Sequence, residues 1–318
     1  MAAPPALEGI PGLKLRPQAP LAEFTRFGLG GPADWLVETE APEAFLDALR
    51  ACRSSGLPFY IIGEGSNLVA SDRGYRGVVL RLAARALRAE GTCIVADAGA
   101  VLQELVDFSI ARGLGGLETL TRIPGSVGAA VYGNAGAYGH SISERIIRVE
   151  FFDGEAHREF SRAECQFEYR ESLFKRYKDW LILRAHVELS PGDSAALRRR
   201  AEEIAQVRDE KFPPAMKCAG SIFKNLLVAD LPAPLAAAIP PPAVREGKVA
   251  AAYFLEQVGA KGLRRNGIQV ASYHANLIYN AGGGTAQDLR ALIDDLRDRV
   301  EARFGLRLEE EIQYLGDW

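Results

Sequence analysis

Two glycine-rich segments hold the residues whose types and spacing best suit chemistry. The first, "GEGSN", covers residues 63–67, and the second, "IPGSVGAAVYGNAGAYG", covers residues 123–139 and is more than half glycine and alanine. Because glycine loses the most conformational freedom on folding, a dense run of it indicates positive φ angles or a close approach by another group. Successive backbone N–H groups, with the side chains of Ser66 and Asn67 as added donors, can hold phosphate oxygens. The predicted chemistry is the binding of a phosphorylated ligand.

The elements that flank the first segment argue against one common type of phosphate site. An apolar run at 59–62 precedes the segment and a second apolar run at 78–82 follows it, which is the pattern of a strand, a glycine loop and another strand. A Rossmann dinucleotide loop instead opens directly into a helix. A tight connection between two strands therefore stands beside an anion-binding loop as an equal alternative for residues 63–67.

The rest of the chain alternates between helical and strand patterns. Apolar residues at helical spacing, with glycine or capping signals at the ends, predict helices over 41–56, 100–113, 194–207, 248–262 and 284–305. The last of these begins with Thr285 and Asp288, which resemble a capping box. Strand patterns cover 146–154, 179–189, 268–280 and 306–316. The proline-rich stretch 227–247 predicts a surface loop or insertion without regular structure.

Composition narrows the class of protein. The 318 residues are 48% hydrophobic and 25% charged, as expected of a globular chain of two or three domains. A net charge of -3 provides no basic stripe for nucleic acid. The first fifteen residues lack the pattern of a secretory signal and no apolar run reaches membrane-spanning length, so we expect a cytoplasmic protein without a membrane span.

The four cysteines are expected to be buried thiols. Cys52, Cys93, Cys165 and Cys218 lie far apart, without a C-x-x-C pair and without histidine at ligand spacing. This arrangement predicts neither a zinc site nor a disulfide framework.

Six motifs along the chain resemble, in sequence order, those of the UDP-N-acetylenolpyruvoylglucosamine reductase family, known as MurB. They are "RFGLGGPADWLVE", "GEGSNL", "IPGSVGAAVYGNAGAYG", "YRESLFK", "AGSIFKN" and "LEEEIQYLG", and the resemblance runs from residue 21 to residue 316. It implies an α+β fold of the shorter subclass, with an FAD-binding region of the vanillyl-alcohol-oxidase type in two subdomains. The implied bounds are 1–78 with the C-terminal strand 308–318, then 79–207, and 208–307 for a substrate domain.

The resemblance also implies an activity. It is the NADPH-dependent reduction of UDP-N-acetylglucosamine enolpyruvate to UDP-N-acetylmuramate in peptidoglycan precursor synthesis, by a cytoplasmic monomer. FAD is expected to be bound non-covalently, since no motif nominates a histidine or cysteine for its attachment. A flavin oxidase of a sugar or alcohol on the same scaffold is the alternative, and flavin reduction by NADPH without peroxide formation would exclude it.

Both glycine-rich segments are implied to lie against FAD, where side chains would collide with it. The implied contacts are Gly63, Glu64, Gly65, Ser66, Asn67, Leu68, Ile123, Pro124, Gly125, Ser126, Gly128, Asn134, Gly136, Ala137 and Tyr138. For single glycines such as Gly128, close packing between the two subdomains is the alternative.

Three residues match the family's catalytic positions. Arg170, in "EYRES", is implied to bind the substrate carboxylate, for which a planar guanidinium is suited. Without the resemblance, an ion pair with Glu171 or Glu168 would be the default for this arginine. Ser221, in "AGSIFKN", matches the proton donor, and a helix N-cap or turn residue is its alternative.

Glu311, in "LEEEI", is implied to assist polarisation or protonation. Three consecutive glutamates make the register decisive, because Glu309 and Glu311 share a face in a regular strand while Glu310 points oppositely. Substrate contacts are implied for Tyr169, Lys211 and Asn225, with a solvated lysine as the alternative for Lys211.

Overall fold

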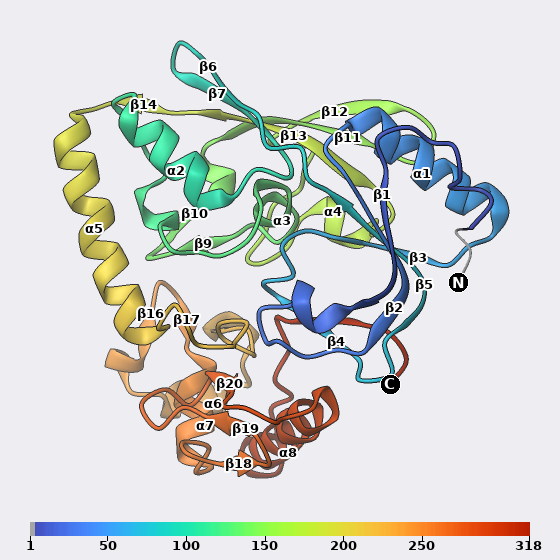
Figure 1. Ribbon diagram of the computed structural model, residues 1–318. Coiled ribbons are helices and arrows are strands. Elements are labelled where there is room, and N and C mark those ends of the chain that lie inside the picture. Colours follow the sequence, from blue (N-terminus) through green and yellow to red (C-terminus); the bar gives the residue numbers. More distant parts are fainter. Residues whose placement is uncertain (1–3) are drawn as a thin grey trace. The chain divides into compact units, whose positions relative to one another are not determined.

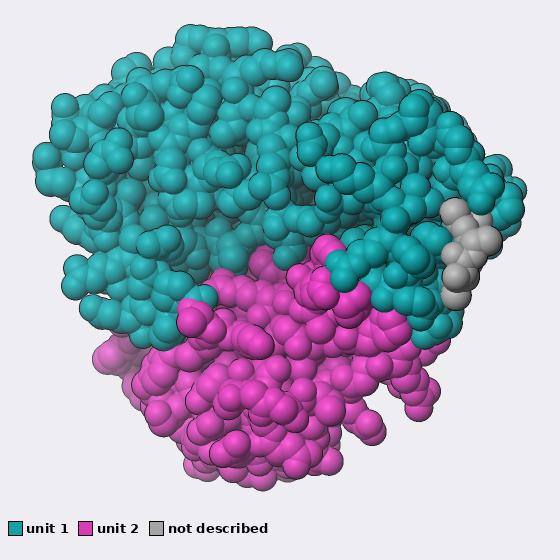
Figure 2. Space-filling view, viewed as in Figure 1, with its two compact units in different colours: residues 1–19, 33–64, 76–214 teal, residues 20–32, 65–75, 215–318 magenta. Residues whose placement is uncertain are grey.

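The computed structural model describes residues 4–318, which form two compact units (Figure 2). Of the described residues, the first unit contains 4–19, 33–64 and 76–214, and the second contains 20–32, 65–75 and 215–318. Each unit is therefore assembled from segments distant in sequence. The path of the chain is shown in Figure 1.

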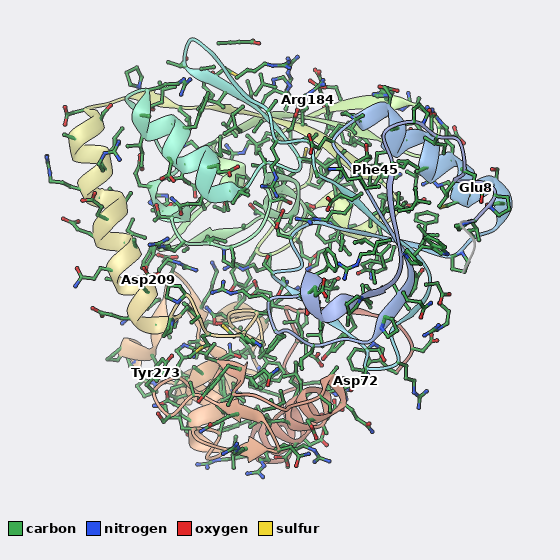
Figure 3. The ribbon with its side chains drawn as sticks, in the orientation of Figure 1. Glu8, Phe45, Asp72, Arg184, Asp209 and Tyr273 are labelled. Carbon is green, nitrogen blue, oxygen red and sulfur yellow. The ribbon has the colours of Figure 1, made fainter. Side chains whose placement is uncertain are left out.

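A four-stranded sheet and one helix build the N-terminal part of the first unit. The strands follow the order β1 (Lys14–Pro20), β2 (Pro32–Thr39), β5 (Tyr75–Leu82) and β3 (Phe59–Ile62). The helix, α1 (Pro42–Ser55), has Pro42 in its first turn and ends at Gly56, whose φ of +67° suits glycine. Its apolar face places Phe45, labelled in Figure 3, in a core with Val78 and Leu80 of β5.

A five-stranded antiparallel sheet forms the other part of the first unit. Its strands are β12 (His157–Ser161), β11 (Ile146–Phe152), β13 (Leu181–Glu188), β7 (Cys93–Asp97) and β6 (Leu87–Glu90). Residues of α2 (Leu102–Ala111) and α3 (Val127–Tyr132) share the sheet's apolar core. The remaining elements are β8 (Leu114–Gly115), η2 (Glu118–Leu120), β9 (Gly136–Ala137), β10 (His140–Ser141), η3 (Ile142–Glu144), α4 (Leu173–Arg176), β14 (Ser190–Pro191) and α5 (Ser194–Lys211).

The second unit contains short strands and three helices. Strand β4 (Leu68–Ala70) pairs in parallel with β21 (Gln313–Leu315). The other elements are η1 (Leu21–Phe24), β15 (Leu226–Leu227), η4 (Val228–Asp230), α6 (Ala233–Ala238), η5 (Pro241–Ala243), β16 (Val244–Arg245), β17 (Lys248–Val249), α7 (Ala251–Gln257), β18 (Arg264–Arg265), β19 (Ile268–Val270), β20 (Ile278–Asn280) and α8 (Ala286–Phe304).

Helix α8 begins with two sets of N-terminal acceptors. Thr285 and Asp288 form the predicted capping box. In addition, the carboxylate of Asp72 accepts hydrogen bonds from Ala286 N (2.8 Å) and Gln287 N (2.9 Å), which ties the 65–75 segment to the helix.

Most of the predicted elements are confirmed. The helices over 41–56, 100–113 and 284–305 correspond to α1, α2 and α8, and the strand pair within 268–280 corresponds to β19 and β20. Helix α5 continues to Lys211, four residues beyond the predicted end, and stops before Pro213, as expected because a residue before proline avoids helical angles. Helix α7 is shorter than predicted.

Two predictions for the second unit were wrong. The stretch 227–247 is not irregular, since it contains α6, and the prolines explain how. Pro232 is the N-cap and Pro234 lies in the first turn, where an N–H has no helical acceptor, while the alanines that follow favour helix. The strand predicted over 306–316 is confined to Gln313–Leu315, because the residues before it make only an isolated antiparallel bridge, Glu310 with Phe223, which is too short to count as a strand.

Three of the four cysteines, Cys52, Cys165 and Cys218, are buried. Burial raises the pKa of the Cys52 thiol to about 11 and that of Cys165 to about 12. Cys93 differs from the prediction, since it is only half-buried on β7. None of the helices in residues 4–318 has the length and apolar character that a membrane span requires.

Candidate active site

The two glycine-rich segments meet in the first unit. Gly63 follows β3, and a Cβ added to it would come within 2.9 Å of Ser126 Oγ. Ser126 is the N-cap of α3, and its hydroxyl accepts a hydrogen bond from Ala129 N (3.3 Å). Bare backbone and hydroxyl groups thus lie together where β3 ends and α3 begins. This chemistry fits the pyrophosphate of a dinucleotide such as FAD.

Several of the glycines are also required by the protein's own backbone. A Cβ on Gly65, whose φ is +60°, would lie 1.8 Å from Phe24 O. A Cβ on Gly136 would lie 2.2 Å from His140 O, and one on Gly128 would lie 2.9 Å from the Cβ of Ala98. Packing within a unit therefore accounts for these three glycines before any ligand is considered. For Gly128 the contact lies inside residues 79–207, and not between the two predicted subdomains.

Other predicted contacts have defined surroundings. The Glu64 carboxylate pairs with Arg81 (2.7 Å) and Arg85 (3.1 Å), so its charge is balanced within the protein. Tyr138 is 50% exposed and has a φ of +54°. The buried residues among them include Leu68, Gly125, Ser126, Gly128, Asn134 and Gly136. Gly63, Ser66, Asn67, Ile123 and Ala137 are partly buried, and Pro124 is exposed.

Arg170 lies against the second glycine-rich segment. Its Nη2 donates to Gly136 O at 2.8 Å. Two further bonds join the same stretches of chain, from Asn134 Nδ2 to Glu168 O (2.7 Å) and from Ser172 Oγ to Tyr132 O (2.7 Å). The "EYRES" loop is therefore fixed to the predicted FAD segment.

Arg170 is partly buried and lies among charged and aromatic neighbours. The carboxylates of Glu171 and Glu168 lie 2.8 Å from Lys175 and 3.8 Å from Arg176, respectively. The main chain at Arg170 has a φ of +59°, which is uncommon outside glycine and concentrates at functional sites. The Tyr169 ring lies 5.4 Å from its guanidinium carbon.

Ser221 and Glu311 are brought together in the second unit. The segment that contains Ser221 runs beside both the 276–277 stretch and the 309–311 stretch. Ser221 bridges Leu277, and the next residue, Ile222, accepts a hydrogen bond from Glu311 N at 2.7 Å. Ser221 and Glu311 are 90 positions apart in the sequence. In the structure, Glu311 is hydrogen-bonded to the residue that follows Ser221.

The three consecutive glutamates have different surroundings. Glu309 Oε1 pairs with Lys224 Nζ at 2.5 Å, although its side chain is 70% exposed. The Glu310 carboxylate receives Arg297 (2.5 Å) and the Tyr314 hydroxyl, and the side chains of Glu310 and Arg297 are 16% and 19% exposed. Because Glu310 carries this half-buried network, it is built into the structure of the second unit.

Lys211 and Asn225, two of the predicted substrate contacts, have the following neighbours in the structure. Lys211, at the end of α5, is half-buried, and desolvation, with a smaller effect of Arg208, lowers its pKa. It therefore differs from the fully solvated lysine of the alternative. Asn225 is exposed and its Oδ1 accepts a hydrogen bond from Ala251 N (3.4 Å).

Sequence reasoning missed one residue that shapes the site. Asn276 is only 2% exposed, and its side chain accepts from Phe223 N (2.9 Å) and donates to Phe223 O (2.8 Å). Its main-chain oxygen accepts from Ile222 N (3.1 Å). The sequence signal that could have indicated Asn276 is its position between the apolar residues Ala275 and Leu277.

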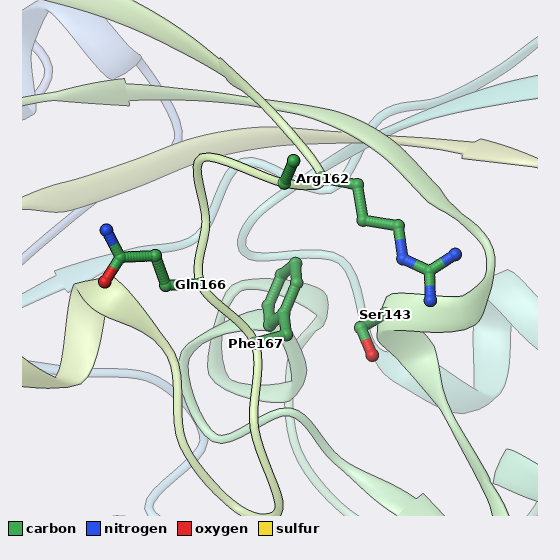
Figure 4. Close-up of a pocket in the computed structure, with 5 residues that line it drawn as sticks. Ser143, Arg162, Gln166 and Phe167 are labelled. Atoms are coloured by element: carbon green, nitrogen blue, oxygen red, sulfur yellow. The ribbon is translucent and has the colours of Figure 1, made fainter.

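Two cavities of the first unit are separate from these residues. One, of about 380 Å³, is lined by Ser143, Arg162, Ala163, Gln166 and Phe167 (Figure 4). The other, of about 320 Å³, includes Arg145, His140 and Arg200 in its lining. Among the described residues, the predicted site residues line neither of the two.

Family models match both halves of the chain. Residues 33–158 match the model described as an FAD binding domain, and residues 212–315 match that of the UDP-N-acetylenolpyruvoylglucosamine reductase C-terminal domain. The reductase of this name from Solibacter usitatus is 58% identical over 310 residues, covering 98% of this chain and 99% of that protein.

This chain belongs to the UDP-N-acetylenolpyruvoylglucosamine reductase family. It is an α+β protein with FAD as its cofactor. Another family member, from Rubrobacter xylanophilus, is 36% identical over 94% of both chains. The crystal structure of the reductase from Thermus caldophilus has a TM-score of 0.74 and 29% identity, and the match covers 95% of this chain and 98% of that one.

Proposed function

We propose that the protein uses NADPH to reduce UDP-N-acetylglucosamine enolpyruvate to UDP-N-acetylmuramate, with Arg170, Ser221 and Glu311 as its catalytic residues. Bound FAD supplies the hydride that is added to the vinyl methylene carbon. Negative charge then gathers on the adjacent carbon and its carboxylate. The protein must stabilise that charge and deliver one proton to the carbon.

The residues divide these tasks. The guanidinium of Arg170 binds the substrate carboxylate, where a planar donor pair suits two oxygens that gain charge. The hydroxyl of Ser221 gives its proton to the carbanionic carbon, and Glu311 assists polarisation or protonation. Tyr169, Lys211 and Asn225 contact the substrate. A serine is a weak acid, so this assignment requires a strongly basic intermediate.

One observation supports the proposal most directly: the main-chain N–H of Glu311 donates to the carbonyl oxygen of Ile222, the residue that follows Ser221. The left-handed main chain at Arg170 and its bond to Gly136 support a functional position for the arginine beside the FAD segment. Membership of the family favours the reductase over the oxidase alternative.

The Ser221→Ala variant tests the proposal through its two half-reactions. Flavin reduction by NADPH should remain near normal in stopped-flow absorbance, while reoxidation by the enolpyruvyl substrate should slow by about 10²-fold or more, the scale for losing a general acid. Ser272→Ala, which changes an exposed serine of the same unit, should leave both halves unchanged. Equal slowing of both halves by Ser221→Ala would make Ser221 a structural residue.

The remaining proposals concern organisation. Residues 1–78 with 308–318 would form one FAD-binding subdomain of the vanillyl-alcohol-oxidase type, 79–207 the second and 208–307 the substrate domain. The parallel pairing of β21 with β4 supports grouping the C-terminal strand with residues 1–78. The separate family models at 33–158 and 212–315 support a domain boundary between residues 158 and 212. We propose a cytoplasmic monomer, for which sedimentation velocity should give a mass near 34.5 kDa.

A further inference from the structure

Both main-chain polar groups of Glu311 are bound by residues of other segments. Its N–H donates to Ile222 O at 2.7 Å, and its carbonyl oxygen accepts from Asn67 Nδ2 at 2.9 Å. These contacts lie within the second unit. Because the peptide on each side of Glu311 is held by a hydrogen bond, the two bonds together fix the main chain of Glu311 and so the direction in which its side chain leaves the main chain.

The hydrogen bond from Asn67 to Glu311 lies just before the first residue pair of the β21–β4 ladder. The parallel ladder of β21 and β4 starts with Gln313 opposite Leu68, and Gln313 N donates to Asn67 O at 2.9 Å. Glu311 therefore lies outside the ladder, where its carbonyl would otherwise have to find another donor. The Asn67 amide supplies that donor and so extends the ordered backbone to the acid.

A second asparagine holds the opposite side of the Ser221 segment. Asn276 exchanges two hydrogen bonds with the main chain of Phe223 and is 2% exposed. The segment is thus fixed between Asn276 on one side and Glu311 on the other. Asn276 thus holds the Ser221 segment, and Asn67 supplies the bond that holds the carbonyl of Glu311.

We propose that Asn67 is a positioning residue for Glu311, in addition to its expected contact with FAD. Through its side-chain amide, the loop "GEGSN" fixes the direction of the acid beside Ser221. The inference rests on the proposed function, because it assigns to Asn67 an effect on the step that Glu311 assists. It differs from a flavin contact, since the amide donates to protein backbone and the effect is expected in substrate reduction alone.

Asn67→Ala provides the first test, measured at saturating FAD. Reoxidation by the enolpyruvyl substrate should slow by about 10- to 100-fold, the range for loss of a group that orients a catalytic residue. Flavin reduction by NADPH should change less than about threefold, on a scale well below that loss. The FAD dissociation constant, from flavin fluorescence, should rise less than reoxidation falls. Equal slowing of both half-reactions, with an FAD dissociation constant that rises by at least the same factor, would overturn the inference in favour of a flavin contact only.

Asn280→Ala is the matched control. Asn280 lies in the same unit, and its Nδ2 also donates to a main-chain oxygen, Phe27 O, at 3.3 Å. This variant loses an equivalent amide-to-carbonyl bond away from Glu311, together with the bonds that its Oδ1 accepts from Gly282 N and Gly284 N. It should still leave reoxidation unchanged, because none of these bonds involves Glu311. If it slowed reoxidation as much as Asn67→Ala does, general loosening of the unit would explain both variants and the inference would fail.

A double-mutant cycle with Glu311→Gln separates this inference from the proposed function. If Asn67 acts by directing the Glu311 carboxyl group, adding Asn67→Ala to Glu311→Gln should slow reoxidation no further. Fully additive effects would overturn the positioning role while leaving the proposed function intact. A Glu311→Gln variant with normal reoxidation would instead remove the acid's assigned role, and with it the basis of the inference.

Discussion

At Arg170 the main chain takes a φ of +59°, and the guanidinium is bound to Gly136 O. Such a backbone costs about 1–3 kcal/mol and persists only where surrounding contacts impose it. Here the contacts are the bonds from Asn134 to Glu168 O and from Ser172 to Tyr132 O. The arginine is thus presented by a strained loop that the glycine-rich segment holds in place.

Replacement of Arg170 is expected to affect substrate reduction. Arg170→Ala should slow flavin reoxidation by about 10²- to 10³-fold, the usual loss for one stabiliser of developing charge. Arg170→Lys should recover only part of the rate, because a point charge cannot supply a bidentate fork. Rapid-mixing measurements of each half-reaction check this, and full recovery by lysine would contradict the bidentate contact.

The glutamates of "LEEEI" should differ in what their replacement does. Glu311→Gln keeps size and hydrogen bonding but removes the titratable group, so it should slow reoxidation and leave flavin reduction by NADPH near normal. Glu310→Gln weakens the network with Arg297 and Tyr314, and should lower the free energy of unfolding by about 1–3 kcal/mol. Denaturant unfolding and stopped-flow absorbance separate the two effects, and a reversal would mean that the acid is Glu310.

At the scale of elements, the glycine loop after β3 serves the fold as well as the ligand. Gly65 combines a φ of +60° with a position 1.8 Å from Phe24 O for any added Cβ. The loop also leads into β4, which pairs with the C-terminal β21. The loop therefore connects β3 to β4 and, through the pairing of β4, to β21, the strand that follows Glu311.

Gly65→Ala is expected to destabilise the protein before its effect on FAD is considered. The strain and the clash together should reduce the free energy of unfolding by about 3 kcal/mol or more in the absence of flavin. Gly247→Ala is the matched control, since Gly247 has a φ of +70° with open space around it, and should lose only about 1–2 kcal/mol. The free energies of unfolding are measured by thermal or urea unfolding. If both variants lost the same amount, the clash with Phe24 O would add nothing to the cost of Gly65→Ala.

At the scale of the whole molecule, the cofactor is expected to be released by unfolding. Cys52, Cys165 and Cys218 are buried. The sequence contains no motif that indicates a covalent bond between the flavin and a histidine or cysteine. Acid precipitation of the yellow protein should therefore leave FAD in the supernatant. Adding FAD at about 100 times its dissociation constant should stabilise the apoprotein by about 2.7 kcal/mol. Flavin that stayed with the pellet would contradict non-covalent binding.

The sequence by itself determined the elements whose signals are local. Pro42 and Gly56 mark α1, the Thr285–Asp288 box marks the start of α8, and β-branched runs mark β11 and β13. Helix caps and apolar periodicity act over a few residues, so they can be read from neighbours in the chain. The order of six short motifs likewise identified the family.

Only the tertiary structure decided which distant residues meet. Ile222 and Glu311 share a hydrogen bond, and Asn67 reaches the Glu311 carbonyl across 244 positions of sequence. The strand predicted for 306–316 shrank to β21 for the same reason, since alternation of residues predicts an extended chain but not its partner. Hydrogen-bond partners between remote segments depend on how the whole chain packs, and no local pattern encodes them.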